Sequence, residues 1–248
     1  MDRKRIMTTY CLLGLLVIAA AGLAYIKIAS IPETDSKTDI VMEYDSKWNP
    51  ERLSDLYGQM LSNYEAGETW KNIPAAKEII YIMKEVAPER DEEINPAMRM
   101  LICERIVDND LIDLRDTPRL YLEYLEYWKM CERMDKIEEE LADLDLDAEF
   151  KERADEMSRK ITLMLSGKKE AVVIWNSLGH LKHDPVQLTP QWEEHVYEIE
   201  KECDERLKDE PRHMGFCHAY WSTKRAVAAN YGIEWRSPSS MNPGVMFD

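Results

Sequence analysis

The clearest structural signal in the chain is the stretch TPRLYLEYLEYWKMC at residues 117–131. Its residues Leu120, Tyr124 and Tyr127 follow the i, i+4, i+7 spacing of one face of an α-helix. Thr117-Pro118 suits the start of that helix, because threonine is a capping residue and the missing N–H of proline costs nothing in the first turn. The stretch therefore predicts a helix with a buried aromatic face. At this spacing the tyrosines are core residues rather than the lining of a ligand groove.

The same kind of start recurs upstream at a nearly constant interval. Pro50, Pro74, Pro96 and Pro118 lie 24, 22 and 22 residues apart, and an apolar stripe follows each of them. Each interval accommodates one helix of about four turns and a short loop. Short loops force consecutive helices to pack as antiparallel neighbours.

Three further helices are predicted downstream, at about 147–165, 189–207 and 213–231. The short run AVVIW at 171–175 is also expected to be helical, because a single strand would have no pairing partner. Gly232, followed by an apolar residue, has the pattern of a left-handed helix cap.

These patterns predict an all-α protein. The expected architecture is an antiparallel helical bundle or a short α-solenoid of about seven helices, and both alternatives stay open at this stage. The helical domain covers residues 49–248 and ends in an irregular tail at 233–248. That tail is too apolar to lie in water, so we expect it to fold back onto the body or to dock on a partner.

An uncharged run of 20 residues, Met7 to Ile26, precedes the helical domain. At about 1.5 Å per residue a helix of this length spans the hydrocarbon core of a bilayer. We expect residues 1–27 to form an uncleaved membrane anchor. A cleaved signal peptide with Gly22-Leu23-Ala24 near its cleavage site is the alternative.

Three basic residues, Arg3, Lys4 and Arg5, stand before the apolar run, and acidic residues follow it. The positive-inside rule then keeps the N-terminus in the cytoplasm and places the body on the outer, periplasmic or extracellular side of a cell membrane. Residues 28–48 are polar and acidic with no helical periodicity, so they are interpreted as a stalk between the anchor and the body.

The charge of the body restricts its partners. The whole chain has a formal charge of −16, and its first 32 residues hold four basic residues against one acidic residue, so the other 216 carry −19. A body this acidic repels phosphate backbones and anionic lipid headgroups. We therefore expect no nucleic-acid partner, and we expect membrane contact through Met7 to Ile26 alone.

Candidate metal ligands gather in the C-terminal third of the chain. All five histidines lie between residues 180 and 218, and clustering of ligand types is a reason to consider a metal site. The candidates are His180, His183, Asp184, His213 and His218. Their spacing matches no standard metal motif. The favoured interpretation is therefore that these histidines lie on polar loops and helix flanks and bind no metal.

Two cysteines are candidates for a disulfide. Cys203 and Cys217 are predicted on two antiparallel helices joined by a turn near residue 211, at similar distances from that turn. A disulfide between them would suit a domain exported to an oxidising compartment. The alternative is two reduced cysteines buried as small apolar residues.

No catalytic or cofactor-binding motif stands out in the chain; the phosphate-binding and nucleophile-elbow patterns are absent. The leading hypothesis is a membrane-tethered, non-enzymatic helical module that binds a protein, or a subunit of an envelope complex. The alternative is a helical metal-dependent hydrolase that uses the histidine-rich C-terminal third.

Overall fold

The computed structural model describes residues 50–86, 94–134 and 149–247, and these residues contain helices and no strands, as the periodicity predicts. The α-helices are α3 (Pro50–Glu65), α4 (Ile73–Tyr81), α5 (Pro96–Asp108), α6 (Pro118–Glu132), α8 (Phe150–Leu165), α9 (Lys169–Asn176), α10 (Pro190–Leu207), α11 (Phe216–Asn230) and α12 (Pro238–Met241). Short 3-10 turns occur at η1 (Thr69–Asn72) and η4 (Pro185–Leu188), and η2 (Ile82–Val86) is a π-helical turn.

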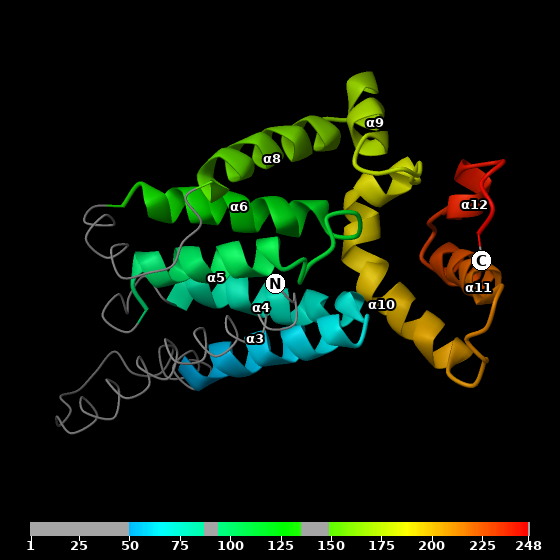
Figure 1. Ribbon diagram of the computed structural model, residues 1–248, viewed down its shortest axis with the longest axis horizontal. Coiled ribbons are helices and arrows are strands. Elements are labelled where there is room, and N and C mark those ends of the chain that lie inside the picture. Colours follow the sequence, from blue (N-terminus) through cyan, green and yellow to red (C-terminus); the bar gives the residue numbers. More distant parts are fainter. Residues whose placement is uncertain (1–49, 87–93, 135–148, 248) are drawn as a thin grey trace, which may run out of the picture.

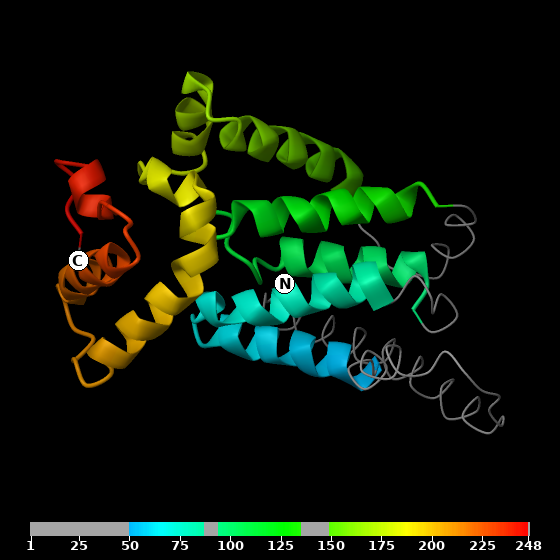
Figure 2. The same ribbon diagram turned by 180° about the vertical axis from the view of Figure 1, so that it is seen from behind.

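The helices α3, α4, α5, α6 and α8 lie side by side, and consecutive ones run in opposite directions (Figure 1). Helix α5 packs on α6, α6 packs on α8, and α3 packs on α4. Helix α10 crosses one end of this array, and α11 and α12 lie on its far side (Figure 2). Short loops thus produce the antiparallel neighbours that the proline spacing predicts.

Two hydrophobic clusters hold the described helices together. The larger one fills the array from α3 to α9, with fully buried side chains such as Met60, Tyr124 and Phe150. The smaller one lies between α10, α11 and the tail, around Trp192 and Trp235. Burial of side chains of this size contributes about 1.5–3 kcal/mol each. Helix α10 therefore belongs to a second core that packs against the end of the first.

Three helices begin directly after a residue of a type that caps helices, and in two of them the side chain of that residue forms the cap. The side chains of Asn95 and Thr189 accept hydrogen bonds from Met98 N at 2.9 Å and Trp192 N at 3.2 Å, which caps α5 and α10. Thr117 makes no such bond at α6. Its hydroxyl donates to the carbonyl of Asp113 instead, at 3.1 Å.

Glycine backbone conformations set the limits of α11. Gly215 has φ of +86°, so the regular helix starts at Phe216 and not at His213 as the periodicity predicts. Gly232 has φ of +71° and ends the helix region with the predicted left-handed cap, in which Ile233 N donates to Ala228 O at 3.1 Å. A Cβ would strain either position.

The C-terminal tail packs on the body. Ile233 and Trp235 are buried in the smaller cluster, and the ring of Phe247 lies edge-on to Trp221 at 5.0 Å between centroids. The tail differs from the expected irregular chain because Ser237 caps one helical turn, α12. Its last residues are open: Met246 is 94% exposed.

The proposed anchor at 1–27, the stalk at 28–48 and Asn49 lie outside the described residues. Among the helices of the described ranges, none combines the length and the apolar character that crossing a bilayer requires.

Candidate functional site

The chain turns back at the end of α10 and continues into α11 (Figure 1). Residues near this turn line a cleft of about 450 Å³. We call it the α10–α11 cleft. Its apolar walls come from Trp70 of η1, from Cys203 and Leu207 of α10, and from Phe216 and Tyr220 of α11. Segments more than 130 residues apart in the sequence thus meet at one hollow, which is the usual construction of a binding site.

The floor of this cleft is a buried ionic cluster. One oxygen of the Glu200 carboxylate accepts a hydrogen bond from the Tyr220 hydroxyl, and the other accepts one from the Lys224 ammonium. Glu200 and Lys224 are 5% and 7% exposed. The Lys224 Nζ also lies 5.1 Å from the Trp192 ring and 5.2 Å from the Trp235 ring. Both oxygens of the Glu200 carboxylate are therefore paired within the protein, which favours a preformed floor.

The pKa values around the floor argue against a nucleophile there. Burial opposes the charged form of Lys224, but Glu200, Tyr220 and Asp116 outweigh it and raise the pKa of Lys224 well above its ordinary value. Burial, helped by the Glu200 charge, raises the pKa of Cys203 to about 12. The lysine is held as a cation and the Cys203 thiol stays protonated at neutral pH, so neither group is poised to act as a nucleophile.

Charged residues form the rim of the α10–α11 cleft. The Arg212 guanidinium lies 5.6 Å from the Phe216 ring and 3.5 Å from a carboxylate oxygen of Asp204. Glu68 pairs with Lys71 at 2.8 Å. His213 Nδ1 donates to the carbonyl of Met214 at 2.8 Å, because a carbonyl oxygen only accepts. The Arg212 pair is the loosest of these contacts, and its side chain is 71% exposed.

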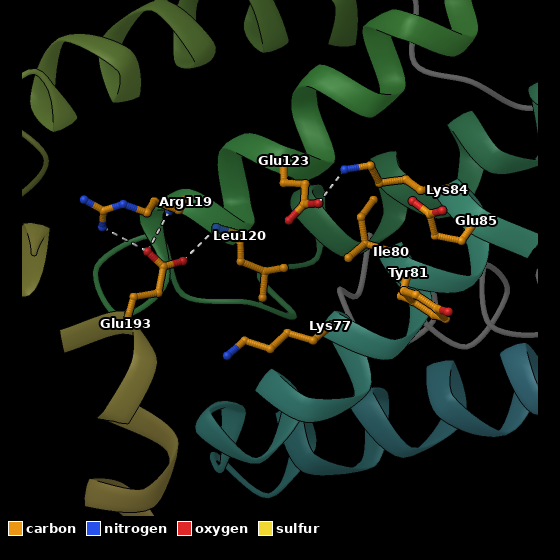
Figure 3. Close-up of a pocket in the computed structure, with 9 residues that line it drawn as sticks. All are labelled: Lys77, Ile80, Tyr81, Lys84, Glu85, Arg119, Leu120, Glu123 and Glu193. Atoms are coloured by element: carbon orange, nitrogen blue, oxygen red, sulfur yellow. Dashed lines mark hydrogen bonds and ion pairs between the residues drawn. The ribbon is translucent and has the colours of Figure 1, made fainter. Parts of the chain in front are cut away.

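A second hollow, of about 340 Å³, lies between α4, α6 and the start of α10 (Figure 3). Four of its charged residues form ion pairs: Lys84 with Glu123 at 2.7 Å, and Arg119 with Glu193 at 3.3 Å. Lys77 extends from α4 into the space between α4 and α10 (Figure 3). This α4–α6 cleft is best described as the seam where α10 joins the helical array.

Glu193 is the central residue of that seam. Its carboxylate accepts hydrogen bonds from the backbone N–H groups of Arg119 at 3.0 Å and Leu120 at 2.7 Å. These groups are orphan donors in the first turn of α6, so Glu193 caps a helix that starts 75 residues earlier in the chain. This contact replaces the Thr117 side-chain cap that the sequence predicts.

The structure separates the candidate metal ligands. His183 packs against Trp175 with 6.0 Å between ring centroids, and His218 packs against Trp221 at 5.3 Å. The Asp184 carboxylate is buried and pairs with Arg236 at 2.9 Å. His180 is exposed, and His213 stands at the rim of the α10–α11 cleft. Across the described ranges, no three His, Cys, Asp or Glu side chains gather in a way that could hold a metal ion.

The two cysteines considered for a disulfide line the same cleft. Cys203 is buried and Cys217 half-buried, and both are free thiols in the structure. The antiparallel turn predicted near residue 211 is present and explains why they face a common space. The disulfide itself stays a prediction.

Sequence reasoning missed Glu193, Glu200 and Lys224, although a signal existed for each. The two glutamates are seven residues apart on α10, beside the buried Val196 and Cys203. Lys224 precedes the buried Val227 and Ala228 by three and four residues, so it lies on the same face of α11. In the sequence, the indication of a buried polar cluster was that these charged residues fall within the apolar stripes of their helices.

Comparisons of the chain with protein-family models, with curated proteins and with solved structures found no match. The geometry of the two clefts is therefore the basis for inferring a function.

Proposed function

We propose that this chain is a membrane-tethered helical module, with its body outside the cytoplasm, that binds another protein at the α10–α11 cleft. The observation that carries the proposal is the cleft itself. Its walls offer Trp70, Phe216 and Leu207 to a partner, and its floor is rigid because Glu200 already satisfies Tyr220 and Lys224. Aromatic residues around a preformed hollow are typical of the places where interface energy concentrates.

The surface beside the cleft supports the same function. Met214, in the turn between α10 and α11, is 83% exposed. A large apolar side chain next to a concave site extends the apolar area that a partner protein covers. The pKa of about 12 for Cys203 keeps this thiol protonated at neutral pH, which makes it a poor nucleophile.

The support for a membrane anchor comes from the sequence. The run from Met7 to Ile26 is long enough to span a bilayer, and the three basic residues before it favour a cytoplasmic N-terminus. Through the stalk at 28–48, the body would stay close to the membrane surface. That position suits a subunit of an envelope complex.

Site-specific photo-crosslinking in intact cells tests the proposal. A photoreactive amino acid replaces His213 at the rim of the cleft, and a matched variant carries it at the exposed Arg159 on α8. We expect a discrete adduct of higher mass with position 213 and none with position 159. No adduct at position 213, or the same adduct at both positions, would contradict a partner-binding cleft.

A further inference from the structure

The charge around the α10–α11 cleft indicates what kind of side chain it receives. Helix α10, which forms one wall, carries seven acidic residues and two basic ones. Of the three carboxylates in the lining, those of Glu68 and Glu200 already pair with Lys71 and Lys224. The carboxylate of Asp204 is held only loosely, by Arg212 at 3.5 Å. Because α10 carries five more acidic than basic residues, a cation is the complementary partner group on this side of the cleft.

The aromatic walls favour the same class of group. Trp70, Phe216 and Tyr220 line the cleft, and the faces of aromatic rings attract cations electrostatically. The protein already shows this attraction at each ring. Lys71 lies 5.3 Å from the Trp70 ring, Arg212 lies 5.6 Å from Phe216, and Lys224 lies 5.8 Å from Tyr220.

Arg212 identifies the cation more closely. Its guanidinium lies over the Phe216 ring and beside the Asp204 carboxylate, which is the pair of contacts that an incoming arginine would need. It is also the most weakly held charge of the cleft, at 3.5 Å from Asp204 and 71% exposed. By contrast, Lys224 is buried in the floor and Lys71 is paired at 2.8 Å.

We propose that the α10–α11 cleft receives an arginine side chain from a basic segment of the partner protein, and that Arg212 occupies this position when no partner is bound. The inference rests on the proposed function, because it names the chemistry of the same docking site. A planar guanidinium stacks on an aromatic ring and pairs with a carboxylate at the same time, which the compact ammonium of lysine does less well. Removing Arg212 should therefore open the site, and removing Asp204 should weaken it.

Peptide binding to the full-length chain in detergent micelles tests this assignment. The probe is a fluorescently labelled Ala-Ala-Arg-Ala-Ala amide, followed by anisotropy, and the same peptide with the neutral isostere citrulline is the comparison. We expect the arginine peptide to bind several-fold more tightly. For Asp204→Asn we expect binding weaker by about three- to fivefold, the range of one exposed ion pair, and for Arg212→Ala binding tighter by a similar factor.

Asp209→Asn is the matched control, because it removes one negative charge from the same end of α10 at an exposed position outside the cleft. Equal binding of the arginine and citrulline peptides would overturn the arginine assignment, and so would equal effects of Asp204→Asn and Asp209→Asn. If the crosslink at position 213 still forms in that case, the proposed docking function stands and only the assignment of an arginine side chain is wrong. Loss of the crosslink itself overturns the proposed function.

Discussion

Glu193 shows how one buried carboxylate connects two helices. It is 8% exposed and accepts hydrogen bonds from two backbone N–H groups in the first turn of α6. We expect Glu193→Ala to lower the free energy of unfolding by about 2 kcal/mol, because it removes a cap and leaves buried donors unpaired. Urea denaturation measures the loss. The exposed neighbour Glu194→Ala should change stability by less than about 0.5 kcal/mol, and equal losses would contradict the capping role.

Asp116 makes stability depend on pH. Burial raises its pKa to about 7; Lys224 opposes this shift, and Asp113 and Glu200 add to it. Between pH 4 and 7 the folded state therefore keeps a proton that the unfolded chain has lost, so the contribution of this group to stability falls as pH rises through that range. Gln187 Nε2, at 3.5 Å from the Asp116 carboxylate, remains a donor for an amide in the same place.

Asp116→Asn should remove this dependence. We expect its melting temperature to increase relative to the wild type as pH rises from 4.5 to 7.5, since the amide never ionises. Thermal unfolding followed by circular dichroism at several pH values measures the difference. If the difference in melting temperature between the two proteins stays constant over this pH range, Asp116 does not titrate there.

At the scale of elements, the tail is a structural part of the smaller core. Trp235 lies in the buried cluster with Trp192, and Arg236 makes bonds to the Asp184 carboxylate through its backbone and its guanidinium. Deleting residues 233–248 should lower the melting temperature by several degrees, because about 2 kcal/mol or more of apolar burial is lost.

A shorter deletion is the control for the tail. Residues 245–248 include the largely exposed Met246 and, of the packed side chains, only Phe247 against Trp221, so their removal should cost less than removal of 233–248. Calorimetry on both truncated proteins compares them. If the longer deletion leaves the melting temperature unchanged, the tail is not structural and its apolar residues are better explained as a docking peptide.

Helix ends were predictable where their determinants are local. Asn95, Thr189 and Gly232 act within a few residues of themselves, and the structure shows a cap at each of them. The position at which α6 starts was predicted correctly. The residue that caps it was not, because the cap comes from Glu193 on α10. The helix expected for the short run at 171–175 is confirmed, as part of α9. Helix α12 was not expected, because four residues are too few to show a helical period in the sequence.

For the molecule as a whole, the first prediction to test is topology. The test uses a reporter enzyme that works only outside the cytoplasm, fused after Asp248. We expect this fusion to be active, because Arg3, Lys4 and Arg5 resist translocation and the rest of the chain crosses the membrane. A second fusion, to a fluorescent protein that folds only in the cytoplasm, should be dark. The reverse result would place the body in the cytoplasm. The mass of the mature N-terminus shows whether residues 1–27 are retained.

The sequence by itself determined the helical class, the proline-started helices and the antiparallel order of neighbours, because periodicity and caps act over one helix and its loop. The tertiary structure decided which charges are buried and where a cleft opens. Glu200, Tyr220 and Lys224 meet only because α10 and α11 pack face to face, and Trp70 reaches the same cleft from a turn far upstream. An apolar stripe predicts that a face is covered but not what covers it. The composition of a site between helices therefore follows from their packing.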